Sequence, residues 1–181
     1  RGTDSIKWGV YEENVLPLWV ADMDFTSPPA VLEALRRRVD HGVFGYAFES
    51  RELKEIIAER MVERYGWKVR REEVILVPVV VPAINLVCEA VTQPGEAVLI
   101  QPPVYPPFFQ APLTAGARVV TSAIQQDSTG EYALDLKSFE AGIQKDTRCF
   151  VLCNPHNPIG KVYRREELTG ILSSRGYFLQ D

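Results

Sequence analysis

The stretch CFVLCNPHNPIG at residues 149–160 decides the fold class of this chain. Its first five residues, 149–153, form a short apolar run that is typical of a buried strand. Two Asn-Pro pairs and Gly160 follow directly, and they predict a rigid loop at the end of that strand. Near-continuously apolar strands of this kind are typical of a parallel sheet that is covered on both faces.

The same pattern of short apolar runs and helical periods extends through the chain after Gly66. Apolar segments at 74–81, 97–100 and 119–120 predict further strands. They alternate with helical patterns at residues 83–92, 135–143 and 165–173. We therefore predict an α/β fold with a mostly parallel sheet and helices on both faces.

The N-terminal part has a different character. Residues 1–26 predict an extended, aromatic-rich arm, after which a helix begins with Ser27 as its cap and Pro28 in its first turn. The apolar residues that recur at helical spacing predict a buried stripe on this helix: Val31, Leu35 and Val39. A second helix is predicted at about 50–65. We expect the arm and first helix in residues 1–48, and part of a larger domain in residues 49–181.

Composition limits the classes of partner. The 181 residues carry 20 Lys+Arg against 24 Asp+Glu, a net charge of −4, so no nucleic-acid partner is expected. No apolar run approaches the ~20 residues that span a bilayer, so no membrane partner is expected either. Three cysteines do not make a disulfide scaffold, and we expect a cytoplasmic location. The start at Arg1 and the apolar run at 176–181 lead us to expect a piece of a longer polypeptide.

Ligands of open α/β sheets bind at the carboxyl ends of the strands. The turn after the first predicted strand, around Val80 and Val81, leads into a helix whose free N–H groups suit a phosphate. After the second strand, prolines on both sides hold Tyr105, whose ring either stacks on a flat heteroaromatic ligand or packs in the core. After the last strand, Asn157 presents an amide donor from a fixed position.

Other chemistries are poorly supported. Only two histidines are present, which disfavours a histidine metal site or a Ser-His-Asp triad. Cys149 and Cys153 lie about 13 Å apart along one strand, too far for a disulfide, and are predicted to be small core residues. Asp22 and Asp24 suggest a paired-carboxylate site, but we favour loop hydrogen bonds or helix caps for them.

Five stretches, in order along residues 1 to about 168, resemble one family. They are RGTDSIKW (1–8), LPLWVADMDF (16–25), HGVFGY (41–46), PVY (103–105) and CNPHNPIGKV (153–162). They resemble the MalY/PatB-type C–S lyases, which are cystathionine β-lyase-like enzymes of the class I/II aminotransferase superfamily and use pyridoxal 5'-phosphate (PLP). The WVADMDF run indicates the lyase branch.

The resemblance implies specific roles. Tyr105 would stack on the pyridine ring, and Asn157 would hydrogen-bond the phenolic oxygen of the cofactor. The backbone N–H groups of Val80 and Val81 would hold its phosphate, and Tyr46 would reach the phosphate in the neighbouring subunit of a homodimer. The residues implied to border the substrate lie in the arm: Trp19, Ala21 and Asp22.

The chain also departs from the family pattern. Val79 stands where the family has Gly beside the phosphate turn, and Pro106 replaces the usual His after the stacking Tyr. The resemblance places the Schiff-base lysine, the substrate-binding arginine and the small C-terminal domain beyond residue 181. The chain by itself is therefore expected to be inactive. Asp181 is a candidate for the aspartate that pairs with the pyridinium nitrogen, although the helix before it is shorter than in the family.

The resemblance implies a C–S β-lyase that cleaves a small-molecule sulfur amino acid to a thiol, ammonia and a keto acid. A class I/II aminotransferase, with the same fold and cofactor contacts, is the first alternative. The second is a truncated, non-catalytic protein that binds a partner, which Val79 and the missing lysine favour.

Overall fold

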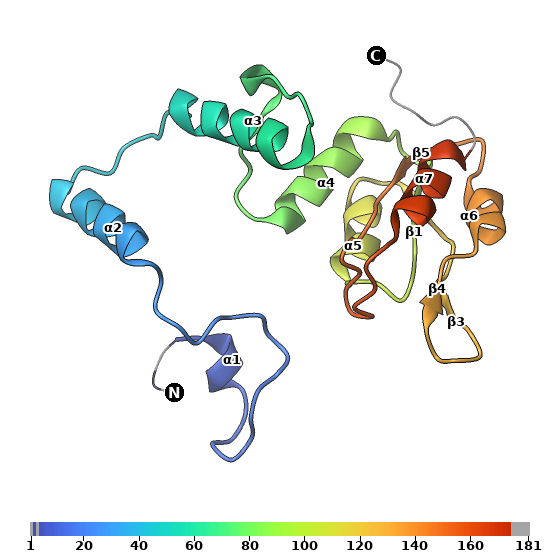
Figure 1. The fold of residues 1–181 in the computed structure, drawn as a ribbon, viewed down its shortest axis with the longest axis horizontal. Helices are drawn as coiled ribbons and strands as arrows, with labels where there is room; N and C mark the ends of the chain where they lie inside the picture. Colours follow the sequence, from blue (N-terminus) through green and yellow to red (C-terminus); the bar gives the residue numbers. More distant parts are fainter. Residues whose placement is uncertain (1, 3, 175–181) are drawn as a thin grey trace. The chain divides into compact units, whose positions relative to one another are not determined.

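The computed structural model of the protein describes residues 2 and 4–174. Its internal contacts divide the chain into two compact units, Arg1–Ser50 and Arg51–Asp181, and each is described by itself. The domain boundary at residue 48 remains a prediction. The helices and strands of the second unit are labelled in Figure 1. In chain order they are α3 (Arg51–Tyr65), the 3₁₀ helix η1 (Arg71–Glu73), α4 (Val80–Val91), β1 (Ala97–Ile100), α5 (Pro107–Thr114), β2 (Arg118–Thr121), β3 (Gln125–Gln126), β4 (Tyr132–Ala133), α6 (Leu136–Gly142), β5 (Thr147–Phe150) and α7 (Arg165–Ser173).

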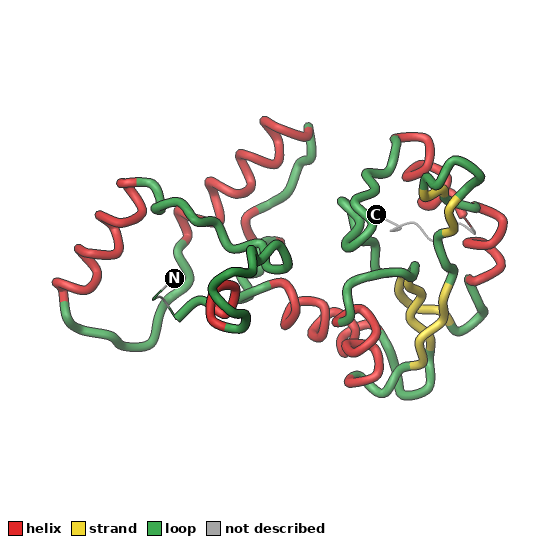
Figure 2. The backbone as a smooth tube through the Cα atoms, turned by 90° about the horizontal axis from the view of Figure 1, so that it is seen from below, coloured by secondary structure: helices red, strands yellow, loops and turns green. Residues whose placement is uncertain are grey.

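A three-stranded parallel sheet lies at the centre of this unit (Figure 2). β1 is the middle strand, between β2 and β5, and Leu99 pairs with Val120 on one side and with Phe150 on the other. All four residues of β1 are fully buried, as expected for a strand with neighbours on both edges and helices on both faces. The short strands β3 and β4 form a separate antiparallel hairpin.

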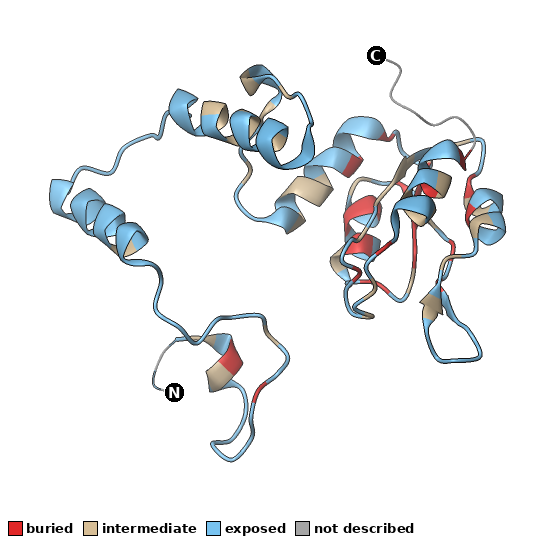
Figure 3. Cartoon of the chain, in the orientation of Figure 1, coloured by how far each residue is buried: buried red, intermediate tan, exposed pale blue. Residues whose placement is uncertain are grey.

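Two hydrophobic clusters cover opposite faces of the sheet. Val98 and Ile100 of β1 belong to the first cluster, with residues of α4 and α5 such as Cys88 and Phe108. Leu99 points the other way, into a second cluster with residues of α6 and α7 such as Phe139. This alternation follows from the period of two along a strand. Buried residues are accordingly concentrated around β1 and α5 in Figure 3.

The α/β class and the parallel sheet with helices on both faces are confirmed. β1 and β2 contain the predicted segments 97–100 and 119–120, and α3, α6 and α7 match the predicted helices within one residue. β5 ends at Phe150, so the last three residues of the predicted strand 149–153 form the start of the loop that follows it.

One predicted strand is absent. Segment 74–81 forms no strand, and its last two residues already belong to α4, which begins at Val80. Pro78 removes a backbone donor, and a short valine-rich run suits a helix turn as well as a strand. Neither α5 nor the β3–β4 hairpin is predicted from the sequence. In α5, Pro107 and Pro112 interrupt the residue pattern that is typical of a helix.

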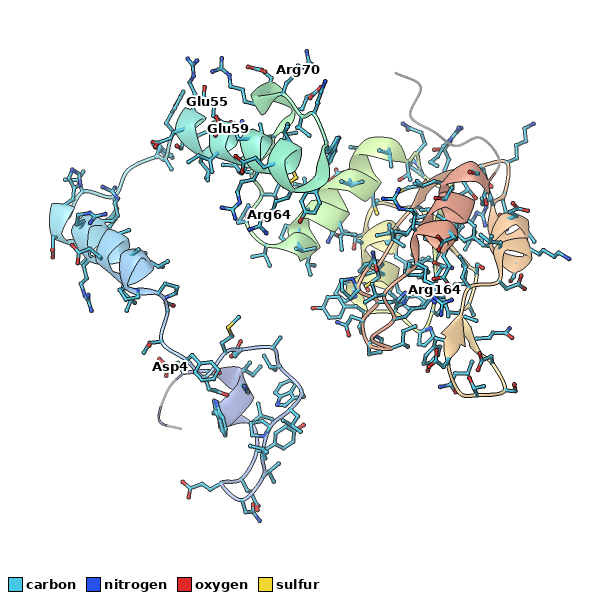
Figure 4. All side chains as sticks on the ribbon, in the orientation of Figure 1. Asp4, Glu55, Glu59, Arg64, Arg70 and Arg164 are labelled. Atoms are coloured by element: carbon cyan, nitrogen blue, oxygen red, sulfur yellow. The ribbon has the colours of Figure 1, made fainter. Side chains whose placement is uncertain are left out.

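α3 and η1 lie beside each other and are joined by an ion pair, in which Arg71 Nη1 lies 2.7 Å from Glu55 Oε1. A second pair lies within the η1 segment itself, where Arg70 Nη2 lies 2.8 Å from Glu73 Oε1. The side chains of Glu55 and Arg70 are labelled in Figure 4. These side chains are largely solvent-exposed, so each pair contributes little to stability.

The unit Arg1–Ser50 contains two helices, α1 (Ile6–Gly9) and α2 (Pro29–His41). α1 is a single helical turn within the arm predicted at residues 1–26. The N-cap of α2 is Pro28, not Ser27, and it makes no side-chain capping bond. Gly42 ends the helix with φ +70°, and its N–H donates to the carbonyl of Val39 at 2.9 Å.

The predicted stripe of α2 is not buried. α2 has no buried residue, and the exposed fractions of its stripe residues are 47%, 59% and 65% for Val31, Leu35 and Val39. The spacing gives an amphipathic helix, but burial also requires a second surface. Within residues 2 and 4–174, no helix has the length and apolar character needed to cross a membrane.

Candidate functional site

Tyr105 and Asn157 lie next to each other at the carboxyl edge of the sheet. Tyr105 is in the loop after β1, and Asn157 is in the loop after β5, the strand parallel to β1. The backbone N–H of Tyr105 donates to the carbonyl of Asn157 at 3.0 Å. The phenol side chain is 41% exposed, so it is not packed in the core, and Asn157 is exposed as well. The structure thus brings the two residues together, while their roles toward a ligand stay predictions.

Local hydrogen bonds hold the Asn157 loop. The N–H of Asn157 donates to Cys153 Sγ at 3.3 Å, and the N–H of Gly160 donates to the carbonyl of His156 at 2.7 Å. The N–H of His156 donates in turn to the carbonyl of Lys161 at 2.7 Å. The loop is therefore a closed turn that presents Asn157 from a defined backbone position.

The N-terminus of α4 is suited to an anion. Val80, which is exposed, and Val81, which is partly buried, begin the helix, and no acidic side chain lies in the first turn. The N-cap residue Val79 makes no side-chain capping bond, so the first N–H groups of the helix remain without an intrahelical partner. Only residues 92–96 connect α4 to the start of β1, so the C-terminus of α4 lies near the amino edge of the sheet. Its N-terminus therefore points toward the carboxyl edge.

Val79 has φ +69° and ψ 150°. Among the described residues it is the one non-glycine residue with positive φ. This combination of angles is populated almost exclusively by glycine, and a β-branched side chain makes it more costly. These backbone angles explain why the family pattern has glycine at this position. Val79 adopts the same angles under strain.

The predicted substrate residues lie in the other unit. Asp22 is held on two sides, because Ser5 Oγ donates to its carboxylate at 2.7 Å and Lys7 Nζ donates to its carbonyl at 2.8 Å. Trp19 packs edge-to-face on Tyr11, with ring centroids 5.9 Å apart. Ala21 is exposed.

Asp24 is the second carboxylate of this loop. Its Oδ2 accepts from Lys7 Nζ at 2.7 Å, and its Oδ1 accepts from Trp8 Nε1 at 2.6 Å. The hydrogen bond from Lys7, followed by that from Trp8, lowers the pKa of Asp24. The favoured interpretation of Asp22 and Asp24 as loop hydrogen-bonding residues is therefore confirmed.

Tyr46 is fully exposed and also belongs to the unit Arg1–Ser50. Its predicted role, like those of Trp19, Ala21 and Asp22, remains a prediction. Asp181 lies outside the described residues. Sequence reasoning missed Lys7, which is only 8% exposed, and a buried group of His156, Tyr163 and Gln101 beneath the Tyr105 loop. A histidine between two Asn-Pro pairs was the available signal for that group.

The cysteines do not provide a nucleophile. Burial raises the pKa of Cys149 to about 11 and also raises the pKa of Cys88, so both remain thiols near neutral pH. Both pack in or against the first hydrophobic cluster, as does Cys153, which confirms the prediction of small core residues. Within residues 2 and 4–174, no group of three or more His, Cys, Asp or Glu is arranged to hold a metal ion.

The site thus offers an accessible phenol ring, an adjacent amide and a helix N-terminus with free donors. Together these groups can hold a flat ring, a polar ring substituent and a phosphate. The free N–H groups and the dipole at the start of α4 favour a negatively charged group on the ligand.

Comparison with known proteins agrees with this chemistry. Residues 13–177 match the family model described as aminotransferase class I and II. Over 173 residues the chain is 40% identical to cystathionine beta-lyase PatB of Bacillus subtilis, covering 92% of this chain and 44% of PatB. The chain thus spans less than half the length of this relative.

Solved structures show the same similarity. The structure of OvoB superposes with a TM-score of 0.86 and 42% identity, covering 95% of this chain and 45% of that one. Cystalysin from Treponema denticola, whose structure contains a pyridoxal 5'-phosphate cofactor, gives a TM-score of 0.83 and 32% identity, covering 93% of this chain and 44% of cystalysin. The resemblance seen in the sequence is confirmed: the chain belongs to the class I and II aminotransferase family.

Proposed function

We propose that this chain carries the PLP-binding part of a C–S β-lyase that acts on a small sulfur amino acid. The observation that supports it most directly is the pairing of Tyr105 with Asn157 at the carboxyl edge of the sheet, 3.0 Å apart at the backbone. Similarity to PatB and cystalysin supports the lyase branch in particular.

The residues present fit PLP group by group. The half-exposed ring of Tyr105 matches the flat pyridine ring, and the amide of Asn157 is a donor for the phenolic oxygen. The N–H groups of Val80 and Val81 at the start of α4 suit the phosphate, which carries the negative charge that this neutral site lacks.

PLP, when bound, supplies an electron sink that permits loss of the α-proton and cleavage of the bond between β-carbon and sulfur. The role proposed for this chain is to hold and orient the cofactor and the substrate. Tyr105 would hold the flat ring by stacking, and Asn157 would hold its phenolic oxygen through a hydrogen bond. Trp19, Ala21 and Asp22 are proposed to border the amino-acid substrate, with Asp22 kept in place by Ser5 and Lys7.

The catalytic lysine is proposed to lie beyond residue 181, as the resemblance implies. Two of the lysines in the chain are already engaged in ion pairs: Lys7 with Asp24 at 2.7 Å, and Lys161 with Glu167 at 2.8 Å. Because the resemblance places the Schiff-base lysine outside this chain, we expect the 181 residues to bind PLP reversibly and to catalyse no turnover.

The whole protein is proposed to be a cytoplasmic homodimer. The stripe of α2 supports a second copy as partner, because Val31, Leu35 and Val39 form an exposed apolar surface on this helix. Tyr46, in the same unit, would contribute to the cofactor site of the partner copy.

The experiment that tests the lyase function uses the full-length protein with PLP. Cystathionine is the substrate, and the release of thiol and keto acid is measured with and without an added keto acid as amino acceptor. A C–S lyase releases both products without the acceptor. Product release that requires the acceptor, or no release at all, would contradict the proposal.

A true aminotransferase is the second candidate, favoured by the match to the aminotransferase family model over residues 13–177. It would transfer the amino group to the added keto acid and leave the carbon–sulfur bond intact. Mass spectrometry of the reaction products distinguishes the two, because only the lyase forms free thiol.

A further inference from the structure

A chain of buried polar groups connects the Tyr105 loop to the Asn157 loop. His156 Nε2 lies 3.0 Å from the carbonyl oxygen of Pro103, and His156 Nδ1 lies 3.2 Å from the hydroxyl of Tyr163. The same hydroxyl donates to Gln101 Oε1 at 3.0 Å. The exposed fractions are 1% for His156, 4% for Tyr163 and 3% for Gln101, so water contributes little to these bonds.

These buried groups are close in sequence to Tyr105 and Asn157, so their hydrogen bonds restrain the backbone of the site. Gln101 directly follows β1, and Pro103 precedes Tyr105 by two residues. His156 directly precedes Asn157. These hydrogen-bonded groups therefore fix the backbone on both sides of the bond between Tyr105 N–H and the Asn157 carbonyl.

Tyr163 is itself anchored at the far end of the Asn157 loop. Its backbone N–H donates to Asn154 Oδ1 at 3.2 Å, which closes the loop from residue 154 to residue 163. Its ring packs in the second hydrophobic cluster, with Phe139 and Ile171. The next residue, Arg164, is labelled in Figure 4 at the entrance to α7, where its N–H donates to Glu167 Oε2 at 2.8 Å.

The hydrogen bonds determine which atoms of His156 and Tyr163 carry protons. A carbonyl oxygen only accepts, so His156 Nε2 must carry a proton to bond Pro103. Burial lowers the pKa of His156, which keeps the imidazole neutral near pH 7 and leaves Nδ1 as an acceptor. Burial raises the pKa of Tyr163, so its hydroxyl keeps its one proton, for which Gln101 Oε1 and His156 Nδ1 are alternative acceptors. Without this hydroxyl, neither buried acceptor has that donor.

We propose that His156 and Tyr163 are positioning residues that set the spacing between Tyr105 and Asn157. The inference rests on the proposed function, under which those two residues hold the cofactor ring and its phenolic oxygen. His156 and Tyr163 are both almost fully buried, so they would act through the backbone of the two loops and not by contact with the cofactor.

The test compares amide hydrogen exchange in the 181-residue chain and in its Tyr163→Phe variant. The variant keeps the ring in the core and removes only the hydroxyl. We expect exchange of the Tyr105 N–H to become about tenfold faster, as for a lost buried hydrogen bond, with exchange of the Leu99 N–H in β1 within about twofold of its original rate. Tyr132→Phe, at another tyrosine packed on the second hydrophobic cluster, is the matched control and should change neither rate.

His156 provides a second set of variants that remains informative if Tyr163→Phe does not fold. His156→Leu should reproduce the local loss at Tyr105, and His156→Gln, whose amide offers both a donor and an acceptor, should restore part of it. Equal acceleration at Tyr105 and Leu99 would overturn the inference, because it would indicate a general loss of stability. Unchanged exchange at Tyr105 would overturn it as well.

PLP binding separates the inference from the function on which it rests. Titration of the unmodified chain with PLP, followed by protein fluorescence, is expected to show saturable binding that weakens about fivefold or more in Tyr163→Phe. Local loosening at Tyr105 with no saturable PLP binding by the unmodified chain would support the positioning role and contradict the proposed cofactor site. Equal PLP affinity in the two chains would overturn the positioning role.

Discussion

Val79→Gly is expected to stabilise the protein, although it removes a side chain. Val79 has φ +69° and ψ 150°, a region that costs a non-glycine residue about 1–3 kcal/mol. Its side chain is 74% exposed, so little apolar burial is lost. Glycine gains conformational freedom in the unfolded chain, which offsets about 0.5–1 kcal/mol. The net expectation is a gain of about 1 kcal/mol, or roughly 2–4 °C in Tm for a chain of this length.

The assay is urea unfolding of the 181-residue chain, followed by circular dichroism. Val80→Gly is the matched control, because Val80 is also exposed but lies in the first turn of α4. That variant should lose about 0.5 kcal/mol through helix propensity. Val79→Ala keeps the Cβ atom, and with it most of the strain, so it should remain close to the original chain.

The test compares the free energies of unfolding of these three variants. If Val79→Gly proves no more stable than Val80→Gly, the backbone at residue 79 is not strained and the reasoning fails. If Val79→Ala stabilises as much as Val79→Gly, β-branching and not the positive φ is responsible. Relief of strain should also leave the N–H groups of Val80 and Val81 more accessible, so Val79→Gly is expected to bind inorganic phosphate or PLP at least as tightly as the original chain.

Three further predictions concern stability. Leu99→Ala should lower the free energy of unfolding by about 2–5 kcal/mol, since Leu99 is fully buried in the second hydrophobic cluster, whereas Leu18→Ala, at an exposed position, should change it by less than about 0.5 kcal/mol; urea titrations compare them. Lys7 holds the pKa of Asp24 below its ordinary value, so the stability that this pair gives the first unit should be complete above about pH 4 and lost as the pH falls through the folded-state pKa. Trp8 fluorescence follows this loss, and Asp24→Asn should abolish it; an unchanged acid transition in the variant would contradict the assignment. Burial lowers the pKa of His156, so the unfolded chain binds a proton below about pH 6.5 that the folded chain does not, and stability should decrease as the pH falls through that range. His156→Gln should remove this slope in unfolding titrations, and a slope that persists would assign it to another group.

The sequence predicts the middle of the sheet better than its surroundings. Residues 97–100 are four apolar residues between turn signals, and β1 is the strand with neighbours on both edges, so local pattern and tertiary environment agree there. At residues 74–81 they do not agree. A run of valines satisfies both the strand pattern and the first turn of a helix, and only the path of the whole chain decides between them.

The candidate site was predictable where strand order alone brings residues together. Tyr105 and Asn157 follow the parallel neighbours β1 and β5, so their loops necessarily meet at one edge. The supporting residues were not predictable in this way. His156 and Pro103 are 53 residues apart, and Lys7 and Asp24 are 17 apart, and no local periodicity links such pairs.

The stripe of α2 shows a different limit. Its spacing correctly gives an amphipathic helix, but spacing contains no information about which surface will cover Val31, Leu35 and Val39. Periodicity identifies the face of a helix that avoids water, and burial depends on where other parts of the assembly lie.

The strand order also affects how this chain will behave in a test tube. In the part of the chain that the structure describes, β2 and β5 each have one strand neighbour, so each leaves an outer edge of its backbone without a strand beside it. Such edges are templates on which strands from other molecules assemble, and β5 is partly apolar. We therefore expect concentrated samples of the isolated polypeptide to self-associate through these strand edges. The apparent molar mass from light scattering should then rise with concentration, while the helical circular dichroism signal is still unchanged.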